Sequence, residues 1–403
     1  MLTARGTRRR VAVVQPYVPG YRTSFFDHLQ ARLASEGVDL EVLHGPTPPH
    51  QAARGDAASC ACASEVPVRR LSLPGGRSLL WRRVQRRAAS ADLVVLEQAL
   101  HNLEAYPLLL RRPTGRLGGG ASRVAFWGHG RTYTKPQSRP EAVVKDALTR
   151  LGSWFFAYTE DGAAHVASRG FPRDRITVVR NSVDTTELVA ARVRAARPGT
   201  AEFAEAALLR KRFGLTGGRT ALYLGGLDAP KRIPFLLDCA DRIAAELPGF
   251  RLLVAGDGAD RDLVDAAANR PGSPVVAIGH TGGPSTAPLG AVSDVMLMPG
   301  RVGLCAVDSF ALRTPVVTTD WPWHAPEFEY LADGRNALVT PDDPAAYAGA
   351  VTALLRDPAR LEALRTACRD DVPAYTTEGM AARFCDGLLK AMERHQRNPH
   401  AGT

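Results

Sequence analysis

A lysine that follows a glycine pair at the end of an apolar run is the feature of this sequence that most directly suggests chemistry. The run 221–224 predicts a buried strand, and Gly225 and Gly226 predict a loop whose backbone can approach a ligand. Lys231 precedes the next helical pattern, in a chain with five lysines and 46 arginines. A cation at the mouth of a helix suits an anion, above all a phosphate. Taken alone, the segment is better explained by a solvated lysine that caps a loop than by a phosphate site.

Short β-branched runs, most of which end in Gly, Pro or Asp, recur along the whole chain. They are 11–16, 39–45, 66–74, 91–98, 123–130, 154–159 and 176–184 in the first half, and 251–258, 275–280, 294–300, 315–320 and 336–340 in the second. Helix-length segments separate them, which predicts β-α units and parallel sheets. Ligands of such sheets bind beyond the carboxyl ends of the strands. The turns there are therefore candidate binding residues, namely Gly225, Gly226, Gly256, Asp257, Gly258 and Gly279.

The length of the chain and one break in its pattern predict two domains. A chain of 403 residues is too long for one ordinary core, and the Ala- and Arg-rich stretch 188–215 shows no strand pattern. We therefore predict an α/β protein of two doubly wound, Rossmann-like domains that face each other across a cleft. The predicted first domain is 1–187, the helical linker is 188–215, and the second domain is 216–375. Residues 376–403 are predicted to end the chain as a helix.

The composition argues against several classes of protein. The arginines of residues 5–10 lead into a strand pattern, so no secretory signal is expected, and no apolar run is long enough to span a bilayer. The six cysteines lack CxxC spacing, which predicts free thiols in a reducing, cytoplasmic compartment. Cys60 and Cys62 have no further ligands near them in sequence, so no metal site is expected.

Positive charge is concentrated in the first half of the chain. Residues 1–185 contain 27 Lys and Arg against 15 Asp and Glu, and the remainder contains 24 against 26. Arg82, Arg83, Arg86 and Arg87 have helical spacing and are expected on one face. Such a face fits peripheral docking on anionic lipid at the inner membrane face, or an acidic acceptor, as well as it fits a merely solubilising surface. Aromatic residues are not interleaved with these arginines, so nucleic acid is not an expected partner.

Five stretches, in this order, resemble the family 4 glycosyltransferases of the GT-B fold: 11–29, 127–130, 156–184, 222–258 and 303–343. The resemblance implies transfer of a hexosyl or related sugar from a nucleotide-sugar donor, with retained anomeric configuration and without metal or another cofactor. The acceptor is expected to be a saccharide, in polysaccharide biosynthesis, or a lipid-linked or small molecule. The resemblance also implies that the first domain binds the acceptor, that the second binds the donor, and that the C-terminal helix packs back on the first domain.

In the family, an arginine and a lysine hold the phosphates of the donor. Lys231 matches the lysine, whereas Gly226 stands at the position of the arginine. We expect Arg232 to supply the second cation, because a planar guanidinium grips phosphate oxygens well. Lys231 and Arg232 are then the catalytic cations that stabilise charge on the leaving diphosphate.

The family also carries two glutamates eight positions apart. Asp308 stands at the second position, where a carboxylate can accept the ribose hydroxyls, but Gly300 at the first has no side chain. Further donor contacts are expected from the start of the following helix and from the loop beyond the next strand: Val302, Gly303, Leu304, His324 and Glu327. A surface histidine and a helix-dipole cap are the alternative interpretations of His324 and Glu327.

In the first domain, His129 lies between two glycines at the end of a predicted strand. The resemblance implies a catalytic contact of this imidazole with the donor sugar or the acceptor, and acceptor contacts by Gly20, Tyr21 and Arg22. Retention without a carboxylate nucleophile favours attack on the same face as the leaving diphosphate. Because Gly226 and Gly300 replace family residues, a catalytically inactive GT-B binding or partner subunit is the alternative. A sugar-nucleotide epimerase would share the fold, but no residue favours it.

Overall fold

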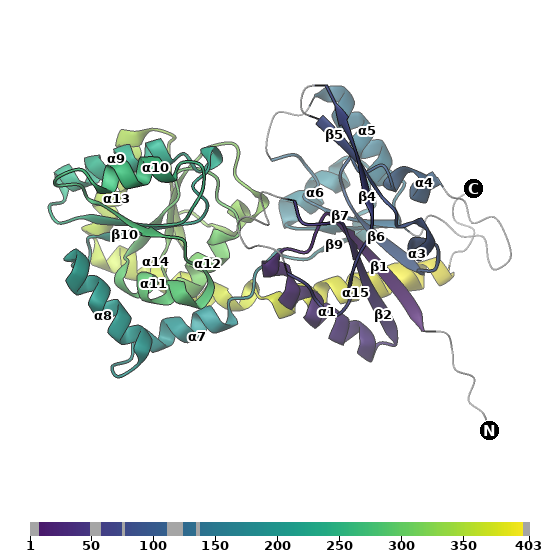
Figure 1. Cartoon of the computed structure of the whole chain (residues 1–403), viewed down its shortest axis with the longest axis horizontal. Helices are drawn as coiled ribbons and strands as arrows, with labels where there is room; N and C mark the ends of the chain where they lie inside the picture. The colour runs from purple at the N-terminus through teal and green to yellow at the C-terminus, as the bar shows by residue number, and fades with distance from the viewer. Residues whose placement is uncertain (1–7, 49–57, 75–76, 111–123, 134–137, 398–403) are drawn as a thin grey trace. The chain divides into compact units, whose positions relative to one another are not determined.

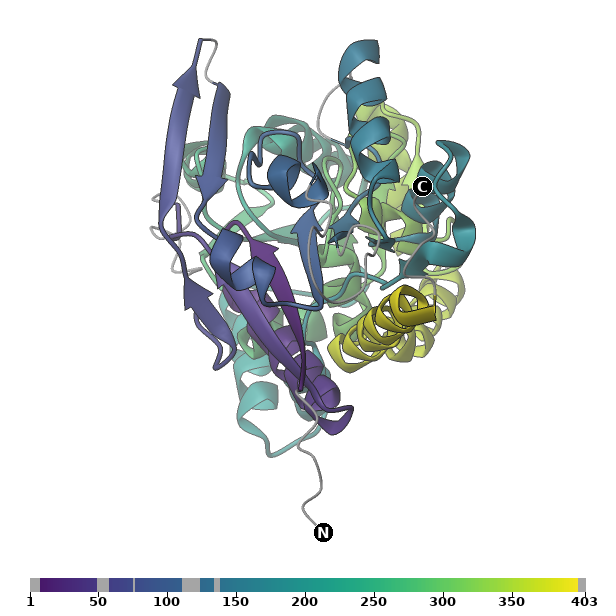
Figure 2. The same ribbon diagram turned by 90° about the vertical axis from the view of Figure 1, so that its right-hand side faces the viewer.

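The computed structural model describes residues 8–48, 58–74, 77–110, 124–133 and 138–397, and the chain divides into two compact units. Unit 1 comprises residues 1–132, 136–183 and 377–403, and unit 2 comprises residues 133–135 and 184–376. Each unit has its own parallel sheet with helices on both faces (Figures 1 and 2). The prediction of two doubly wound α/β halves is thereby confirmed.

The sheet of unit 1 has the strand order β3-β2-β1-β6-β7-β8-β9, and all its neighbouring strands are parallel. Its strands are β1 (Arg9–Gln15), β2 (Val38–His44), β3 (Ala63–Glu65), β6 (Leu93–Glu97), β7 (Val124–Gly128), β8 (Trp154–Ala157) and β9 (Ile176–Val178). The described helices are η1 (Gly20–Arg22), α1 (Thr23–Ser35), α3 (Gln85–Ala89), α4 (Ala105–Leu110), α5 (Arg139–Arg150), α6 (Glu160–Ser168), η2 (Arg173–Arg175) and α15 (Thr377–Arg397). The chain reverses its direction of winding between β1 and β6, which are neighbours in the sheet.

The stretch 66–74, predicted as a strand of the parallel sheet, instead forms a separate antiparallel hairpin, β4 (Val68–Leu73) with β5 (Arg77–Arg82). Arg82 ends β5, where its side chain is buried and forms an ion pair with Glu104. Arg82 and Arg83 therefore do not share a helical face with Arg86 and Arg87, because the helix α3 begins only at Gln85. Arg87 lies on that helix and pairs with Glu41.

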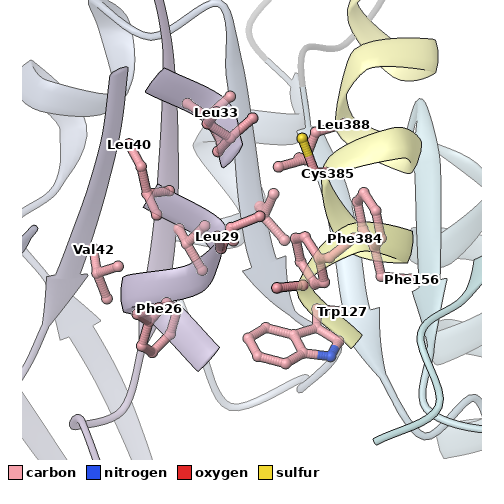
Figure 3. Close-up of a cluster of buried hydrophobic side chains, with 14 of the residues drawn as sticks. Phe26, Leu29, Leu33, Leu40, Val42, Trp127, Phe156, Phe384, Cys385 and Leu388 are labelled. Carbon is pink, nitrogen blue, oxygen red and sulfur yellow. The ribbon is translucent and has the colours of Figure 1, made fainter. Parts of the chain in front are cut away.

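The last long helix of the chain, α15, belongs to unit 1 and covers one face of its sheet. Met380, Phe384 and Leu388 recur every four residues and are fully buried, so they form a single apolar stripe. Phe384 stacks on Phe156 of β8 with ring centres 4.1 Å apart (Figure 3). Gly387 permits this approach, because a β-carbon there would lie 2.6 Å from the Phe156 ring. Each fully buried large apolar side chain contributes about 2–3 kcal/mol.

The sheet of unit 2 has the order β12-β11-β10-β13-β14-β15 and is also parallel. Its strands are β10 (Thr220–Leu224), β11 (Arg251–Ala255), β12 (Val275–Gly279), β13 (Val295–Leu297), β14 (Val316–Thr319) and β15 (Ala337–Thr340). The winding reverses between the neighbouring strands β10 and β13. In open α/β sheets such a switch point is where ligands bind, beyond the carboxyl ends of the strands.

Helices cover both faces of the unit 2 sheet. In Figure 1, α9 (Ile233–Glu246), α10 (Arg261–Ala268) and α13 (Pro344–Leu355) lie on one face, and α11 (Ala287–Val292), α12 (Cys305–Leu312) and α14 (Pro358–Asp371) on the other. Short 3₁₀ turns are η3 (Ala229–Lys231), η4 (Gly283–Thr286), η5 (Pro326–Tyr330) and η6 (Val372–Ala374). The predicted linker 188–215 is not a separate segment: α7 (Thr186–Arg194) and α8 (Ala201–Phe213) belong to unit 2 and pack on α11.

All six cysteines are buried free thiols, as predicted. Within the described part of the chain, no helix has the length and apolar character needed to cross a membrane.

Candidate functional site

Glycines bring the loops after β10 and β11 into direct backbone contact. A β-carbon on Gly256 would lie 2.0 Å from the carbonyl oxygen of Gly225, and one on Gly258 would lie 2.5 Å from that of Leu227. Gly225 and Gly258 also have positive φ values, 149° and 156°, which favour glycine. The Gly256 amide in turn donates to the carbonyl of Gly279, 2.9 Å away, at the end of β12. Three consecutive strands thus end in loops whose glycine backbones contact one another directly.

Lys231 projects over this surface. Its Nζ donates to the carbonyl oxygen of Arg301 at 2.6 Å, and it lies 4.0 Å from the position that a β-carbon of Gly225 would take. The ammonium group is therefore fixed between the loops after β10 and β13, at the switch point. Among the described residues, its hydrogen-bond partner is a neutral carbonyl and not a carboxylate, so the ammonium keeps its charge available for an anion.

Gly300 lies directly against the turn that carries Lys231. A β-carbon on Gly300 would lie 2.5 Å from the Pro230 carbonyl oxygen and 2.6 Å from the carbonyl carbon of Lys231. The Arg301 amide also donates to the Pro230 carbonyl at 2.9 Å. The backbone of the lysine turn therefore occupies the space that the first family glutamate would enter.

Arg232 follows Lys231 but is bound to the protein itself. It has a left-handed φ of 57°, and its guanidinium forms an ion pair with Asp342. The guanidinium carbon lies 4.3 Å from the ring centre of Phe235 and 5.7 Å from that of Trp321, which are cation–π distances. Its charge is thus partly balanced before any ligand binds, unlike that of Lys231.

Gly226, the other departure from the family, faces Asp228. A β-carbon there would lie 2.8 Å from a carboxylate oxygen of Asp228. The hydroxyl of Tyr223 donates to the Gly226 carbonyl, and burial raises the pKa of this Tyr223 hydroxyl. A longer side chain at 226 would therefore require Asp228 to move.

His324 is neither a surface residue nor an open ligand contact, because both of its ring nitrogens are used within unit 2. Nδ1 accepts from the Val302 amide at 3.1 Å, and Nε2 lies 2.8 Å from the Thr319 carbonyl oxygen. This pattern requires the neutral ring with its proton on Nε2. Burial lowers the pKa of His324, and the nearby charge of Lys231 lowers it further. The Val302 amide is consequently occupied, which argues against its predicted role as a donor-phosphate contact.

Glu327 places a carboxylate beside the start of α12. Its side chain is buried, and Oε2 lies 3.9 Å from the position of a β-carbon on Gly303. It lies in the 3₁₀ helix η5, which begins at Pro326. Glu327 acts by opposite charge on Arg301, whose pKa is lowered by burial and partly restored by this carboxylate. Arg301 is a half-buried cation of the site that the sequence reasoning missed, although its position directly after the β13 strand pattern was a usable signal.

Asp308 lies in the first turn of α12, and Leu304 is the residue at which that helix is capped. Desolvation of its carboxyl group raises the pKa of Asp308 to about 7. Among the described residues, none forms a hydrogen bond or an ion pair with this carboxyl group. A carboxyl group without an internal partner is suited to accept or donate hydrogen bonds with hydroxyl groups of a ligand.

Arg22 in unit 1 is a buried cation, 5% exposed, rather than an open surface contact. Its Nη2 donates to the Asn181 side-chain oxygen at 2.6 Å, and Nη1 lies 3.5 Å from the Met380 sulfur. No carboxylate in the described part of the chain pairs with it. The guanidinium carbon lies 5.1–6.0 Å from four aromatic ring centres, those of Tyr21, Phe25, Trp127 and Tyr158.

His129 is exposed at the carboxyl end of β7, as the sequence predicted. Its ring meets the edge of Tyr158 at 4.4 Å, so Tyr158 contacts both His129 and Arg22. The loop is fixed because Gly130 has a positive φ of 76° and a β-carbon there would lie 2.5 Å from the Gly162 carbonyl of α6. Unit 1 thus brings its predicted residues together: His129, Arg22, the 43%-exposed Tyr21 and the neighbouring Gly20.

Comparison with known proteins finds a family that matches most of unit 2. Residues 218–357, which contain the loops after β10, β11 and β13, match the family "Glycosyl transferases group 1". A glycogen synthase of Mycobacterium tuberculosis is 26% identical over 230 residues, which are 56% of this chain and 50% of that protein. A D-inositol 3-phosphate glycosyltransferase of Thermobispora bispora is 28% identical over 247 residues, 58% of this chain and 54% of that protein. The chain thus spans about half the length of these curated relatives.

Solved structures match both units. HepE of Anabaena in complex with UDP has a TM-score of 0.63 at 14% identity, covering 95% of this chain and 100% of that one. A glycosyltransferase from Rickettsia africae has a TM-score of 0.66 at 12% identity, with 96% and 100% covered. A sucrose-phosphate synthase of Thermosynechococcus elongatus has a TM-score of 0.65 at 16% identity, with 96% and 100% covered. The predicted GT-B fold is therefore confirmed, and residues 218–357 match the glycosyl transferases group 1 family that the resemblance implied.

Proposed function

We propose that the protein is a glycosyltransferase that moves a sugar from a nucleotide-diphosphate-sugar donor to an acceptor. The observation that carries the proposal is Lys231, an ammonium group fixed by the Arg301 carbonyl above glycine backbone at the switch point of unit 2. A cation that no carboxylate balances, at this position beyond the strand ends, suits a diphosphate. The family match of residues 218–357 and the UDP complex of HepE, a protein of the same fold, support this chemistry.

In this proposal the roles of the cations differ from those expected from the sequence. Lys231 contacts the diphosphate, because Arg232 is held by Asp342 and two aromatic rings. Arg301 and the amides of Gly303 and Leu304 are further candidates for the negative charge. The site supplies its own positive charge, which is the reason for proposing a metal-independent reaction.

Two carboxyl groups have different proposed roles. Asp308 would hold hydroxyl groups of the donor. Glu327 would act near the sugar, in place of the side chain that is missing at Gly300. No side chain of the site described here is placed as a nucleophile, so retention by attack on the face of the departing diphosphate remains the proposed course. The acceptor would meet His129, Tyr21 and the surface above Arg22 in unit 1.

The proposed acceptors are saccharides, in polysaccharide biosynthesis, and lipid-linked or small molecules. For the lipid-linked case, α5 offers two exposed apolar side chains, Val143 and Val144, and its C-cap residue Leu151 offers a third; the helix also carries Arg139 and Arg150. Exposed apolar residues next to basic ones suit peripheral contact with an anionic membrane surface. Unit 1 is also the more basic half of the chain.

The alternative, a catalytically inactive binding or partner subunit, is favoured by one observation. Gly300 cannot carry the family glutamate, since the backbone of Pro230 and Lys231 fills that space. The two functions predict the same nucleotide binding and differ in turnover.

The test is a panel of nucleotide sugars, assayed for release of the nucleoside diphosphate with a chelator present and with added acceptors and membranes. Wild type should turn over one donor, and Lys231→Ala should bind the nucleotide about 10- to 100-fold more weakly, the effect of losing a hydrogen bond to a charged group. Lys211→Ala, an exposed lysine of α8, is the matched control and should behave as wild type. Binding without turnover of any donor would support the inactive subunit, and equal binding by Lys231→Ala would exclude the proposed phosphate site.

A further inference from the structure

A cavity of about 270 Å³ lies in unit 2 at the opposite edge of the sheet from the glycine loops. Its lining includes Thr216 and Ser293, which precede β10 and β13, and Arg313, which precedes β14. These are the amino ends of the strands. A five-residue strand such as β10 rises about 16 Å, so the cavity and the loop after β10 are separate sites.

Five arginines line this cavity, contributed by three helices and the end of a fourth: Arg192 of α7, Arg210 of α8, Arg313 after α12, and Arg365 and Arg369 of α14. Two of the guanidiniums are fixed by backbone oxygens. Arg192 Nε donates to the Leu312 carbonyl at 2.9 Å, and Arg210 Nη2 donates to the Ala291 carbonyl at 2.9 Å. A neutral carbonyl orients a guanidinium without cancelling its charge.

Carboxylates balance this charge only in part, because Arg365 pairs with Asp294 and Arg369 pairs with Asp370. Asp294 and Glu362 also line the cavity. Asp294 is already saturated, because one of its oxygens accepts from Arg365 at 2.7 Å and the other from the Thr220 amide at 2.9 Å. Burial lowers the pKa of Arg192 to about 10, and repulsion from Arg313, Arg365 and Arg210 adds to the effect. The arginines therefore destabilise one another when the cavity holds only water.

A buried hydroxyl group in the lining is a second, independent sign that the cavity holds a ligand. Ser293 is 4% exposed, and its Oγ has no hydrogen-bond partner among the described residues. Buried polar atoms are nearly always paired, by protein, water or ligand. Thr216 and Thr366 place two further hydroxyl groups in the lining.

We propose that this cavity is a second binding site, for a small phosphorylated molecule, distinct from the donor site. Planar guanidiniums from different helices can each donate paired hydrogen bonds to phosphate oxygens, and Ser293 can donate another. The volume exceeds what one phosphate needs and is slightly below the range of drug-sized pockets, which fits a phosphate attached to a small polyhydroxyl group. The ligand's negative charge would relieve the repulsion among the arginines.

The helix α12 gives such a ligand a physical route to the glycosyltransferase site. Its first turn carries Asp308, and its last residue, Leu312, accepts the hydrogen bond from Arg192. The next residue, Arg313, lines the cavity with a left-handed φ of 57°. The eight residues of α12 span about 12 Å, so a single rigid element ends at both sites.

The test measures binding of ribose 5-phosphate by calorimetry, with ribose as the uncharged control. Pocket variants are Arg192→Gln and Arg313→Asn, the latter because asparagine tolerates a left-handed backbone. Each should weaken binding about tenfold or more, as expected for the loss of a charge-assisted hydrogen bond. The controls are Arg242→Ala, an exposed arginine of α9, and Lys231→Ala, which alters the proposed donor site; both should bind as wild type.

Circular dichroism and thermal melting of every variant separate lost binding from lost folding, and the two independent pocket variants must agree. Weakened binding in Lys231→Ala with unchanged binding in both pocket variants would place the probe in the donor loops and overturn the proposal. Absence of saturable binding by wild type at millimolar concentration would overturn it as well. Because the readout is binding of a non-nucleotide, the result does not depend on whether the protein transfers sugars.

Discussion

Gly300 is packed against the backbone of Lys231, with no space for even a β-carbon between them. The contact joins the loops after β10 and β13, the two strands between which the sheet changes its direction of winding. The residue that departs most from the family pattern is therefore the one that allows the lysine turn to close over the site.

Substitution of Gly300 should consequently damage the fold as well as the site. Gly300→Ala would place a methyl group 2.5–2.6 Å from backbone atoms, which cannot move as a side-chain end can. We expect a loss of about 1–3 kcal/mol in the free energy of unfolding, as for overpacking of an interior, measured by urea denaturation. Gly303→Ala is the matched control, because its β-carbon would lie 3.5 Å from the nearest atom and should be tolerated. Equal stability of the two variants would contradict the packing described here.

Asp308 should make the protein less stable as the pH rises. Burial raises its pKa from 3.8 to about 7, so between these values the folded carboxyl group keeps a proton that the unfolded chain has lost. The stability that the protonated carboxyl group contributes is fully present below the pKa of the unfolded chain. It is lost as the pH rises through the pKa of the folded protein. Asp308→Asn should remove this loss and raise the free energy of unfolding by about 2 kcal/mol at pH 8. This is less than the full pKa shift would give, because the residue is only half-buried and solvent screens its charge. Melting temperatures from pH 4 to 8 test this, and a variant that retains the wild-type slope would disprove it.

His324 should act in the opposite direction. Because burial lowers its pKa below 6.5, the unfolded chain takes up a proton before the folded protein does. The stability that His324 contributes is present above the unfolded pKa and is lost as the pH falls through the folded pKa. His324→Gln should cost about 1–3 kcal/mol at pH 8 by weakening the hydrogen bonds to Val302 and Thr319. It should also flatten the acid limb of the stability profile.

The control for this substitution is His280→Gln, which changes an exposed histidine after β12. Its melting temperature should match that of wild type across the pH series. If His324→Gln were as stable as His280→Gln, the hydrogen bonds of His324 with Val302 and Thr319 would contribute nothing to stability.

Arg22 should be irreplaceable by lysine. A lysine retains the positive charge but lacks the planar group that lies among the rings of Tyr21, Trp127 and Tyr158 and donates to Asn181. We expect Arg22→Lys to destabilise unit 1 by about 1–3 kcal/mol. Thermal melting should show no such change for Arg32→Lys, an exposed position on α1. A neutral outcome for Arg22→Lys would mean that charge alone matters at this position.

Sequence patterns predicted the elements that local chemistry determines. The apolar runs that became β10 and β13, and the glycine turns after them, are recognisable because buried parallel strands and close backbone contacts restrict residue type. The pattern could not show which partner a strand pairs with, so 66–74 was assigned to the wrong sheet. The expected basic face failed at Arg82 because its burial depends on Glu104, 22 residues away.

The site was predictable to a similar degree. Lys231, His129 and Asp308 follow from position in a motif, and the structure places them at strand or helix ends. Whether a side chain is available to a ligand depends instead on contacts between distant segments. His324 is engaged by residues 302 and 319, and Arg232 by Asp342, 110 positions away. No local window of sequence contains that information.

The position of α15 has a consequence for the order in which the protein can fold during synthesis. Unit 2 is almost continuous in sequence and ends at residue 376, whereas unit 1 begins the chain and takes its last core helix from residues 377–397. Phe384 and Leu388 complete the core around Trp127 and Leu29 (Figure 3). A ribosome adds about 5–20 residues per second, so the nascent first unit must wait for roughly 200 further residues, ten seconds or more. During that time α1 is present, but the part of the same core that α15 covers stays exposed. The part of the chain made first is therefore the part that finishes folding last.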